Sequence, residues 1–507
     1  MYNIFQRFDN WKLQPLILIS VAICIKIAYF IFIFLSSNSH LPYLNMIVNG
    51  DDVTYMAFSE NIFVIGDYCV KTGNVYDYTF RMPGFAFLYV PIRIFTNKII
   101  TMNSLVIIQI VLSGIAAYYL AWLAKNIFKN NKVFYFVYFL TAFGFYMPMY
   151  NSILVTESLA TSFLIFSLYF FHQAIETKKN SFFLFSGLFM TWLIFLRAFM
   201  IMIFIVTIML IVWYVFKKVT SFKHVIFFLL PFLLIDGVWA TRNYYKINNF
   251  LPLESSVNSN QCNLKSTTAS AVFIKTFGFH WEQWVRDSER GWLESNNPKA
   301  MMKNSIFPSR TFNGGLTIDS LLKVRECVQL ANNNNFGLEE RYVADANATR
   351  LLHKFITELK KNRPWDYYLF NKIRTLRSFL SENVYYPLVS LPFPLNGIFV
   401  FIDLFIDMLL KCVGLFGALY ILFKYHRNYS VVFIITFVPF FLLALFPIYL
   451  GDDEHREFFM AYPFLIISSA YILSLIFNSR YKWLLLSLVL FIPFLLAAYS
   501  TFLKVYY

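Results

Sequence analysis

Long apolar runs separated by short polar connections make up most of this chain. A run of about 20 apolar residues is long enough to cross a bilayer as a helix. By length and hydropathy, the pattern predicts about eleven transmembrane helices. We expect them near residues 16–35, 103–124, 133–150, 154–174, 181–197, 199–216, 225–240, 402–423, 430–449, 458–477 and 483–503.

Two segments between the apolar runs are too long to be simple connections. The first covers residues 36–102. Its apolar stretch from Phe85 to Phe95 contains Pro91 and Arg93 and is too short to span, so we expect a helix in the membrane interface. The second covers residues 241–395 and is large enough to fold as a soluble domain of mixed structure.

This second segment carries a helical pattern from Leu338 to Leu380. Apolar residues such as Leu352, Phe355 and Leu359 recur there at helical spacing. The sequence Asn-Arg-Pro at 362–364 should end one helix and begin another, because proline favours the first turn of a helix and disfavours its interior.

The pattern thus predicts an all-α polytopic membrane protein in three parts. Residues 1–240 form an N-terminal transmembrane region that includes the first outward loop, 36–102. Residues 241–395 form the outward soluble domain, and residues 396–507 form a C-terminal transmembrane region. Composition agrees, with 58% hydrophobic, 21% aromatic and 14% charged residues. We do not expect residues 1–35 to be a signal peptide, because they lack a small-residue cleavage site and further spans follow.

Basic residues in the short connections predict the orientation. Clusters such as Lys125 with Lys129 and Lys132 fall on the same side as Arg7 and Lys12 if the spans alternate. The positive-inside rule then places the N-terminus in the cytoplasm. The first loop and the soluble domain would face the exterior of a bacterial inner membrane.

The formal net charge of +15 raises the question of nucleic acid. The basic residues are divided between cytoplasmic connections and the outward domain, without a contiguous stripe. Topology and anionic membrane lipid account for the cytoplasmic share, and the outward share suits a phosphate-bearing ligand. We therefore expect no nucleic-acid partner.

Cysteines and short motifs exclude several chemistries. The sequence contains no CxxC, HExxH, Walker loop or GxGxxG, so neither a zinc site nor a nucleotide is implied. Cys24 and Cys412 lie within predicted spans. Cys69, Cys262 and Cys327 would face outward, where one disulfide can form and leave one thiol.

Two adjacent carboxylates, Asp51 and Asp52, follow the first apolar run. If this segment is helical, Tyr55 lies one turn after Asp51 on the same face. A carboxylate at the mouth of an apolar cavity can act as a base or a metal ligand, because its surroundings tune its pKa. The alternative is that both are solvated charges of an outward loop.

Further ionisable and polar residues gather at the outward ends of the spans. Alone, each could be an interface charge that reaches water. Together they predict an outward polar pocket in which arginines bind phosphate and carboxylates deprotonate hydroxyls or hold a metal. The residues in question are Glu157, Arg197, Arg242, Asn243, His455 and Arg456.

Ordered motifs across the chain resemble the integral-membrane glycosyltransferases of the GT-C fold. Within this family, the chain looks most similar to the bacterial branch that is related to dolichyl-phosphate-mannose protein mannosyltransferases and to the aminoarabinose transferase of lipid A. Phe85 replaces a tyrosine of the family pattern, a proline is missing before Trp239, and the last motif has one extra residue. The matching segments are Asp51 to Tyr55, Arg81-Met82-Pro83-Gly84-Phe85, Thr156-Glu157-Ser158-Leu159, Trp239 to Tyr244, and Glu454 to Phe458 with Pro463 following.

The resemblance implies an inverting transferase that takes a sugar from a polyprenyl-phosphate donor. The acceptor would be a protein, a lipid or a cell-surface glycan. Asp51 would be the general base, with Asp52 the less favoured member of the pair. Glu157 would orient the acceptor or a metal. Four arginines would bind the leaving phosphate, namely Arg81, Arg197, Arg242 and Arg456, with Tyr55, Asn243 and His455 as further substrate-binding candidates.

The resemblance requires no cofactor. Asp51 with Glu157 could hold a divalent cation such as Mg²⁺ or Mn²⁺, although we expect the reaction to be metal-independent.

Two other functions fit a chain of this kind. A flippase for lipid-linked sugars would favour internal repeats and charges at mid-membrane depth, and neither is evident in the sequence. An O-antigen polymerase or ligase would not require an early aspartate such as Asp51 and would depend on charges in later loops.

Overall fold

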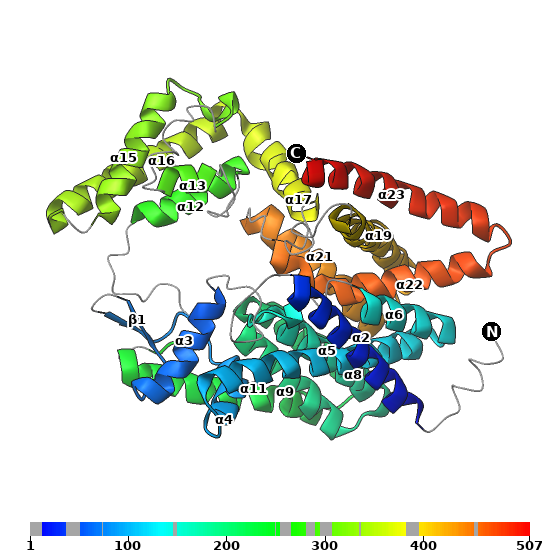
Figure 1. Cartoon of the computed structure of the whole chain (residues 1–507). Coiled ribbons are helices and arrows are strands. Elements are labelled where there is room, and N and C mark those ends of the chain that lie inside the picture. Colours follow the sequence, from blue (N-terminus) through cyan, green and yellow to red (C-terminus); the bar gives the residue numbers. More distant parts are fainter. Residues whose placement is uncertain are drawn as a thin grey trace. The chain divides into compact units, whose positions relative to one another are not determined.

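The fold was analysed in a computed structural model, which is helical with one small hairpin (Figure 1). The described residues are 13–36, 51–72, 75–144, 150–248, 250–253, 265–279, 289–294, 307–333, 336–381, 395–450 and 455–506. In the hairpin, β1 (Val70–Thr72) pairs antiparallel with β2 (Val75–Asp77). The predicted helical fold class is therefore confirmed.

The first half of the chain contains the helices of the N-terminal apolar runs. They are α2 (Gln14–Ser36), α3 (Asp51–Val64), α4 (Ala86–Arg93), α5 (Lys98–Phe128), α6 (Asn131–Phe143), α8 (Glu157–Thr177), α9 (Asn180–Leu196), η1 (Ala198–Met200), α10 (Ile201–Phe216) and α11 (Phe222–Ile247).

The second half contains shorter, more polar helices followed by apolar ones. They are α12 (Lys265–Phe277), α13 (Glu289–Glu294), η2 (Ser309–Thr311), α15 (Ile318–Asn332), α16 (Leu338–Asn362), η3 (Asp366–Phe370), α17 (Asn371–Ser381), α19 (Leu395–Lys424), α20 (Tyr429–Val432), η4 (Phe433–Phe437), α21 (Val438–Leu443), η5 (Ala444–Leu450), η6 (His455–Ala461), α22 (Tyr462–Asn478) and α23 (Lys482–Tyr506).

Each predicted span overlaps a helix or a series of helical segments, but the count of eleven is not confirmed. Within the described ranges, eight helices are long and apolar enough to cross a membrane. They cover Gln14–Phe32, Lys98–Phe128, Glu157–Thr177, Ala198–Phe216, Phe222–Ile247, Tyr429–Leu450, Phe458–Asn478 and Lys482–Thr501. The helix α9 is apolar but shorter, and α6 has only 13 residues.

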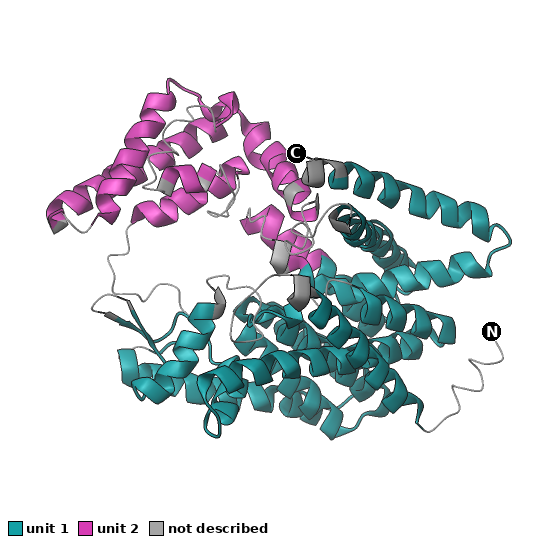
Figure 2. Cartoon of the chain, in the orientation of Figure 1, with its two compact units in different colours: residues 1–258, 384–439, 459–507 teal, residues 259–383, 440–458 magenta. Residues whose placement is uncertain are grey.

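The chain forms two compact units (Figure 2). Unit 1 contains residues 1–258, 384–439 and 459–507, and unit 2 contains residues 259–383 and 440–458. The predicted division at residue 240 stays a prediction, although α11 continues through this position to Ile247. The mixed structure expected for the soluble domain is wrong for its described part, where the regular elements are the helices from α12 to α17.

Small and hydroxyl-bearing residues let helices of unit 1 approach closely. The hydroxyls of Ser167 in α8 and Ser186 in α9 each donate to the other's carbonyl, both at 2.9 Å. At Gly187, a side chain would overlap the carbonyl of Phe228 in α11. Such residues are typical of contacts between membrane helices, because they allow the backbones to approach. They fix α9 between α8 and α11.

Unit 2 has its own apolar core, built by α12, α13, α15 and α16. Phe273, Trp292, Leu321 and Phe355 are at most 2% exposed in this core. The helix α16 ends at Asn362, and η3 begins shortly after Pro364. The predicted helix from Leu338 onward and its interruption at 362–364 are therefore confirmed.

Candidate active site

The motif that begins at Asp51 is helical, as its spacing required. The helix α3 starts at Asp51, so this position and Tyr55 lie on one face, one turn apart. Tyr55 is only 5% exposed. The side chains of Asp51 and Asp52 lie outside the described part of the structure, which fixes only their place at the start of α3.

Arg81 contacts the same tyrosine from the loop between the hairpin and α4. Its Nη1 donates to the Tyr55 hydroxyl at 3.1 Å, and its guanidinium lies 4.5 Å from the centre of the Tyr55 ring. A cation above an aromatic face is attracted by the negative charge of the ring face. The first and second family motifs thus meet at Tyr55.

Gly84 allows the loop that carries Arg81 to dock on the end of α9. Its amide donates to the carbonyl of Phe195 at 3.1 Å, and the Trp192 indole donates to the Gly84 carbonyl at 2.9 Å. A Cβ at position 84 would overlap the Phe195 carbonyl, so only glycine permits this approach. The Arg-x-Pro-Gly sequence therefore holds Arg81 beside the last turn of α9.

The helix α9 ends at Leu196, and Arg197 adopts an extended conformation before η1 and α10 begin. The two short helices predicted to meet at Arg197 do so. Arg197 forms an ion pair with Glu157, the first residue of α8. The Glu157 side chain is fully buried and that of Arg197 is 10% exposed.

Such a pair is tolerated in an apolar bundle because each charge neutralises the other. The start of α8 also favours a carboxylate, since the helix dipole is positive there.

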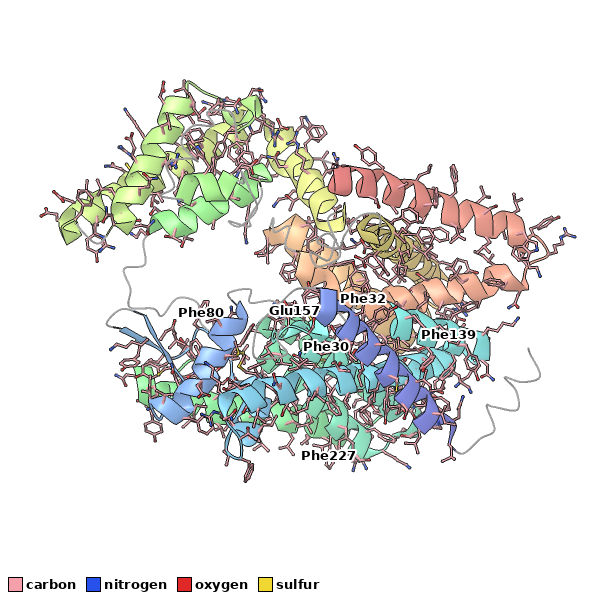
Figure 3. All side chains as sticks on the ribbon, in the orientation of Figure 1. Phe30, Phe32, Phe80, Phe139, Glu157 and Phe227 are labelled. Carbon is pink, nitrogen blue, oxygen red and sulfur yellow. The ribbon has the colours of Figure 1, made fainter. Side chains whose placement is uncertain are left out.

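Thr156, the neighbour of Glu157 in the sequence, joins the Arg81–Tyr55 contact to the Glu157–Arg197 ion pair. Its hydroxyl donates to that of Tyr55 at 3.5 Å. We call Tyr55, Arg81, Thr156, Glu157 and Arg197 the central cluster. Its members come from four separate segments of unit 1, and Glu157 lies among the helices of that unit (Figure 3). Four predicted site residues are therefore brought together, namely Tyr55, Arg81, Glu157 and Arg197.

Arg242 and Asn243, near the C-terminal end of α11, hold the loops beside this cluster. Arg242 donates to the carbonyls of Tyr68 and Tyr78 and to the Asn243 side chain. It also contacts Asp67 at 3.4 Å. Asn243 donates to the carbonyl of Leu251 at 2.9 Å. In this structure the Arg242 guanidinium therefore fixes the loop that leads to Arg81, and its predicted contact with phosphate stays a prediction.

Asp67 has two cationic partners, Arg242 and Lys246. Burial alone would raise the pKa of Asp67, but the hydrogen bond and charge of Lys246 and the charge of Arg242 lower it below the usual value. The carboxylate is thus ionised at neutral pH and neutralises one of the two cations. One positive charge remains in excess at this site.

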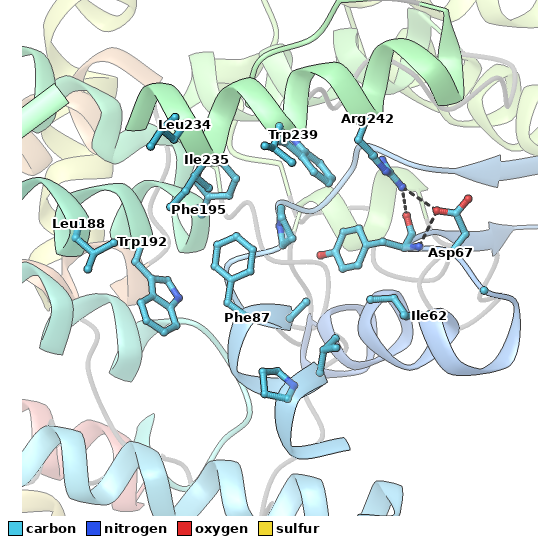
Figure 4. A pocket seen from close by; sticks show the side chains of 17 residues that line it. Ile62, Asp67, Phe87, Leu188, Trp192, Phe195, Leu234, Ile235, Trp239 and Arg242 are labelled. Carbon is cyan, nitrogen blue, oxygen red and sulfur yellow. Dashed lines mark hydrogen bonds and ion pairs between the residues drawn. The ribbon is translucent and has the colours of Figure 1, made fainter. Parts of the chain in front are cut away.

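A cavity of about 940 Å³ extends from Arg242 and Asp67 into apolar surroundings. Figure 4 shows these two residues at one end and Leu188 and Trp192 at the other. The remaining lining comes mainly from apolar side chains of α3, α4, α9 and α11, such as Phe87. The shape and polarity suit an amphiphile with one anionic end and a hydrocarbon chain.

Sequence reasoning missed the residues that hold the segment before Glu157. Gln109 of α5 donates to the carbonyls of Asn151 and Ile153, both at 3.0 Å. The Ser158 hydroxyl donates to the Asn151 side chain at 2.5 Å. All four residues are buried. The available signal was an amide side chain within the apolar run of α5, where polar groups need partners.

His455 and Arg456 begin η6, but their side chains lie outside the described part. The helix α22 starts shortly after, at Tyr462. The Tyr462 hydroxyl donates to Asp407 of α19 at 2.6 Å, and Asp407 also pairs with Lys411 at 2.7 Å. These buried contacts fix the chain just beyond the last family motif.

Among the described side chains, no group of three His, Cys, Asp or Glu residues is arranged to hold a metal ion. Cys69 and Cys327 are free thiols. Cys262 lies outside the described residues, as does the side chain of Asp51, on which the candidate cation site depends.

No family model and no curated protein matches this chain. The chain is similar to a solved structure of the oligosaccharyltransferase of Archaeoglobus fulgidus, tethered with an acceptor peptide. The identity is 11%, the match covers 97% of this chain and 55% of that one, and the TM-score is 0.44. This chain thus spans about half the length of the archaeal protein.

A second similar structure is ArnT from Cupriavidus metallidurans, bound to undecaprenyl phosphate. Its identity is 10%, the match covers 91% of this chain and 78% of that one, and the TM-score is 0.34.

Gly84 should not tolerate even a methyl group. We expect Gly84→Ala to displace the Arg81 loop from α9 and lower stability by about 1–3 kcal/mol, the usual effect of overpacking. The apparent melting temperature of the purified protein in detergent measures this. Gly237→Ala is the matched control, because nothing lies within 4 Å of its added Cβ. Equal melting temperatures for both variants would contradict the close approach.

The Glu157–Arg197 pair should behave as a unit. Removing one partner, as in Glu157→Gln, should lower stability by about 3–5 kcal/mol, because a buried charge loses its counter-charge. Adding Arg197→Met should restore part of that loss. Thermal unfolding of both single variants and the double variant tests this coupling.

The surface pair of Arg363 and Asp366, 3.9 Å apart, provides the control, since Arg363→Met should cost only about 0–1 kcal/mol. Additive losses in the double variant would show that the buried charges act independently.

Proposed function

We propose that this protein is a membrane glycosyltransferase that moves a sugar from a polyprenyl-phosphate donor to an acceptor outside the membrane. The convergence of the central cluster carries this proposal. Three of the ordered family motifs supply four of its five members, all except Arg197, although these motifs are up to about a hundred residues apart in the sequence. A chance resemblance of short motifs gives no reason for them to meet.

The reaction needs a base and a cationic site for the leaving phosphate. Asp51 would take the proton from the acceptor as it attacks the anomeric carbon, with inversion. Its position at the start of α3 is one turn from Tyr55, which Arg81 contacts. Asp52 lacks this i+4 relation to Tyr55 and is the less favoured base.

Arg81 and Arg197 are candidates for neutralising the departing phosphate, since guanidinium forks match its oxygens. Glu157 neutralises Arg197 in the structure and would orient the acceptor or release the arginine to the donor. Arg456 and His455 would add to the phosphate site from the late loop. The reaction is proposed to run without a metal, although Asp51 and Glu157 could hold Mg²⁺ or Mn²⁺.

The apolar cavity supports a lipid-linked donor. Its hydrocarbon lining suits the prenyl chain of such a donor. Of the helices that line it, α11 is long and apolar enough to cross a membrane, and the apolar lining would keep such a chain out of water. A nucleotide sugar has no hydrocarbon chain and would not need such a lining.

The two alternatives lack a comparable observation. A flippase has no need of a base at the start of α3. An O-antigen polymerase or ligase would rely on the late loops, whereas the central cluster uses only residues up to 197. Protein, lipid and glycan acceptors are all compatible with the proposal.

Asp51→Asn should abolish sugar transfer while the protein still inserts and binds undecaprenyl phosphate. Loss of a general base slows proton transfer by about 10²–10⁴-fold, whereas the donor lipid does not need the carboxylate. Transfer would be measured with labelled polyprenyl-phosphate sugar and a membrane extract, and lipid binding by native mass spectrometry.

Asp52→Asn is the matched control and should keep most of its activity. Near-normal turnover of Asp51→Asn would remove Asp51 as the base. Loss of activity in Asp52→Asn alone would assign that role to its neighbour.

A further inference from the structure

Unit 2 exposes a series of large apolar side chains from Trp365, just before η3, to the start of α17. Trp365 is 70% exposed, Tyr368 61% and Ile373 50%, with Leu369 and Phe370 at 42% and 48%. We call these five residues the aromatic stripe. Soluble domains rarely expose contiguous apolar patches unless they are interaction sites.

The stripe is turned outward by the packing of the same helix, not by loose structure. Asn371, Thr375 and Phe379 repeat every four residues and are at most 3% exposed. Asn371 donates to the carbonyl of Thr276 in α12 at 3.0 Å. With this face anchored, the opposite face, which carries Leu369 and Ile373, must point away from the core of unit 2.

Basic residues surround the stripe. Between residues 360 and 377, the sequence has six basic residues and one acidic residue. Asp366, the acidic one, lies 3.9 Å from Arg363 and 3.6 Å from Arg374. The six are Lys360, Lys361, Arg363, Lys372, Arg374 and Arg377. The segment thus keeps a large excess of positive charge.

Some of these positive charges lie close enough to repel one another. Burial lowers the pKa of Lys372, and the charge of Lys275 in α12 lowers it further. Lys360 Nζ lies 5.6 Å from the centre of the Tyr367 ring and 5.9 Å from that of Tyr368. An anionic surface would relieve the repulsion between these cations while contacting the aromatic rings.

We propose that segment 360–377 binds the surface of a membrane that contains anionic lipid. Tryptophan and tyrosine prefer the level of the lipid headgroups, and a basic amphipathic helix lies in the plane of that interface. The basic residues would contact lipid phosphates while the aromatic stripe enters the headgroup region.

A membrane is within reach, because unit 2 is joined in the chain to helices that can span one. This inference does not depend on the proposed glycosyl transfer.

The test uses the full chain, with its five native cysteines replaced, in vesicles with or without phosphatidylglycerol in phosphatidylcholine. A nitroxide is attached at Leu369→Cys or, as the control, at His353→Cys, an exposed position on α16. Collisions with oxygen and with a water-soluble nickel complex report depth.

We expect a severalfold higher oxygen-to-nickel ratio at position 369 than at 353 in phosphatidylglycerol vesicles. The ratio at position 369 should be lower in phosphatidylcholine alone. Equal ratios at both positions in both vesicles would overturn the proposal, as the stripe would then face water. Shielding from both reagents would also overturn it, because protein, either unit 1 or a second copy, would then cover the stripe.

A charge variant separates lipid attraction from folding. In the labelled protein, Lys372→Gln combined with Arg377→Gln should lower the oxygen-to-nickel ratio at position 369 to the ratio measured in phosphatidylcholine alone. The value at position 353 in the same variant should not change, which shows that unit 2 is still folded. An unchanged value at position 369 would mean that anionic lipid does not hold the segment, and would overturn the proposal.

Discussion

The buried ion pair between Glu157 and Arg197 is the constraint on which the candidate site depends. Two charges within apolar helices are stable only if they meet, since each alone would have a large desolvation cost. Their meeting requires α8 to begin, and α9 to end, at the same place in unit 1. The loop with Arg81 docks on that same end of α9 through Gly84, so the position of this arginine follows from the position of the pair.

A second set of contacts, made by Arg242, holds the loops beside the central cluster. Arg242 binds two backbone carbonyls of the hairpin region and thereby links α11 to the loops around Tyr68 and Tyr78. The Tyr68 hydroxyl in turn donates to the carbonyl of Met82 at 3.0 Å, next to Arg81. The residues of the motifs therefore divide into those of the central cluster and those that hold the loops beside it. Arg242 belongs with the second kind in this structure.

Much of the fold could be predicted from the sequence, because helix periodicity and helix breaks are local. The end of α16 at Asn362 and the break at Arg197 both follow from short patterns. The pairing of Glu157 with Arg197 could not be predicted, because no pattern in the sequence joins residues 40 positions apart. The backbone carbonyls that accept hydrogen bonds from Arg242 and Gln109 could not be predicted either, because every residue has a carbonyl and the sequence does not distinguish among them. The mixed structure expected for residues 241–395 is wrong for the described residues, because their polar helices lack the long apolar runs that made the other helices evident.

The choice of donor is the most direct test of the proposed sugar transfer from a polyprenyl phosphate. Purified protein in lipid nanodiscs would be incubated with a membrane extract as the source of acceptor. The same labelled sugar would be supplied either as a polyprenyl monophosphate or as a nucleotide sugar. We expect transfer from the polyprenyl donor, with release of polyprenyl phosphate, and none from the nucleotide sugar. Transfer from the nucleotide sugar alone would contradict the proposal.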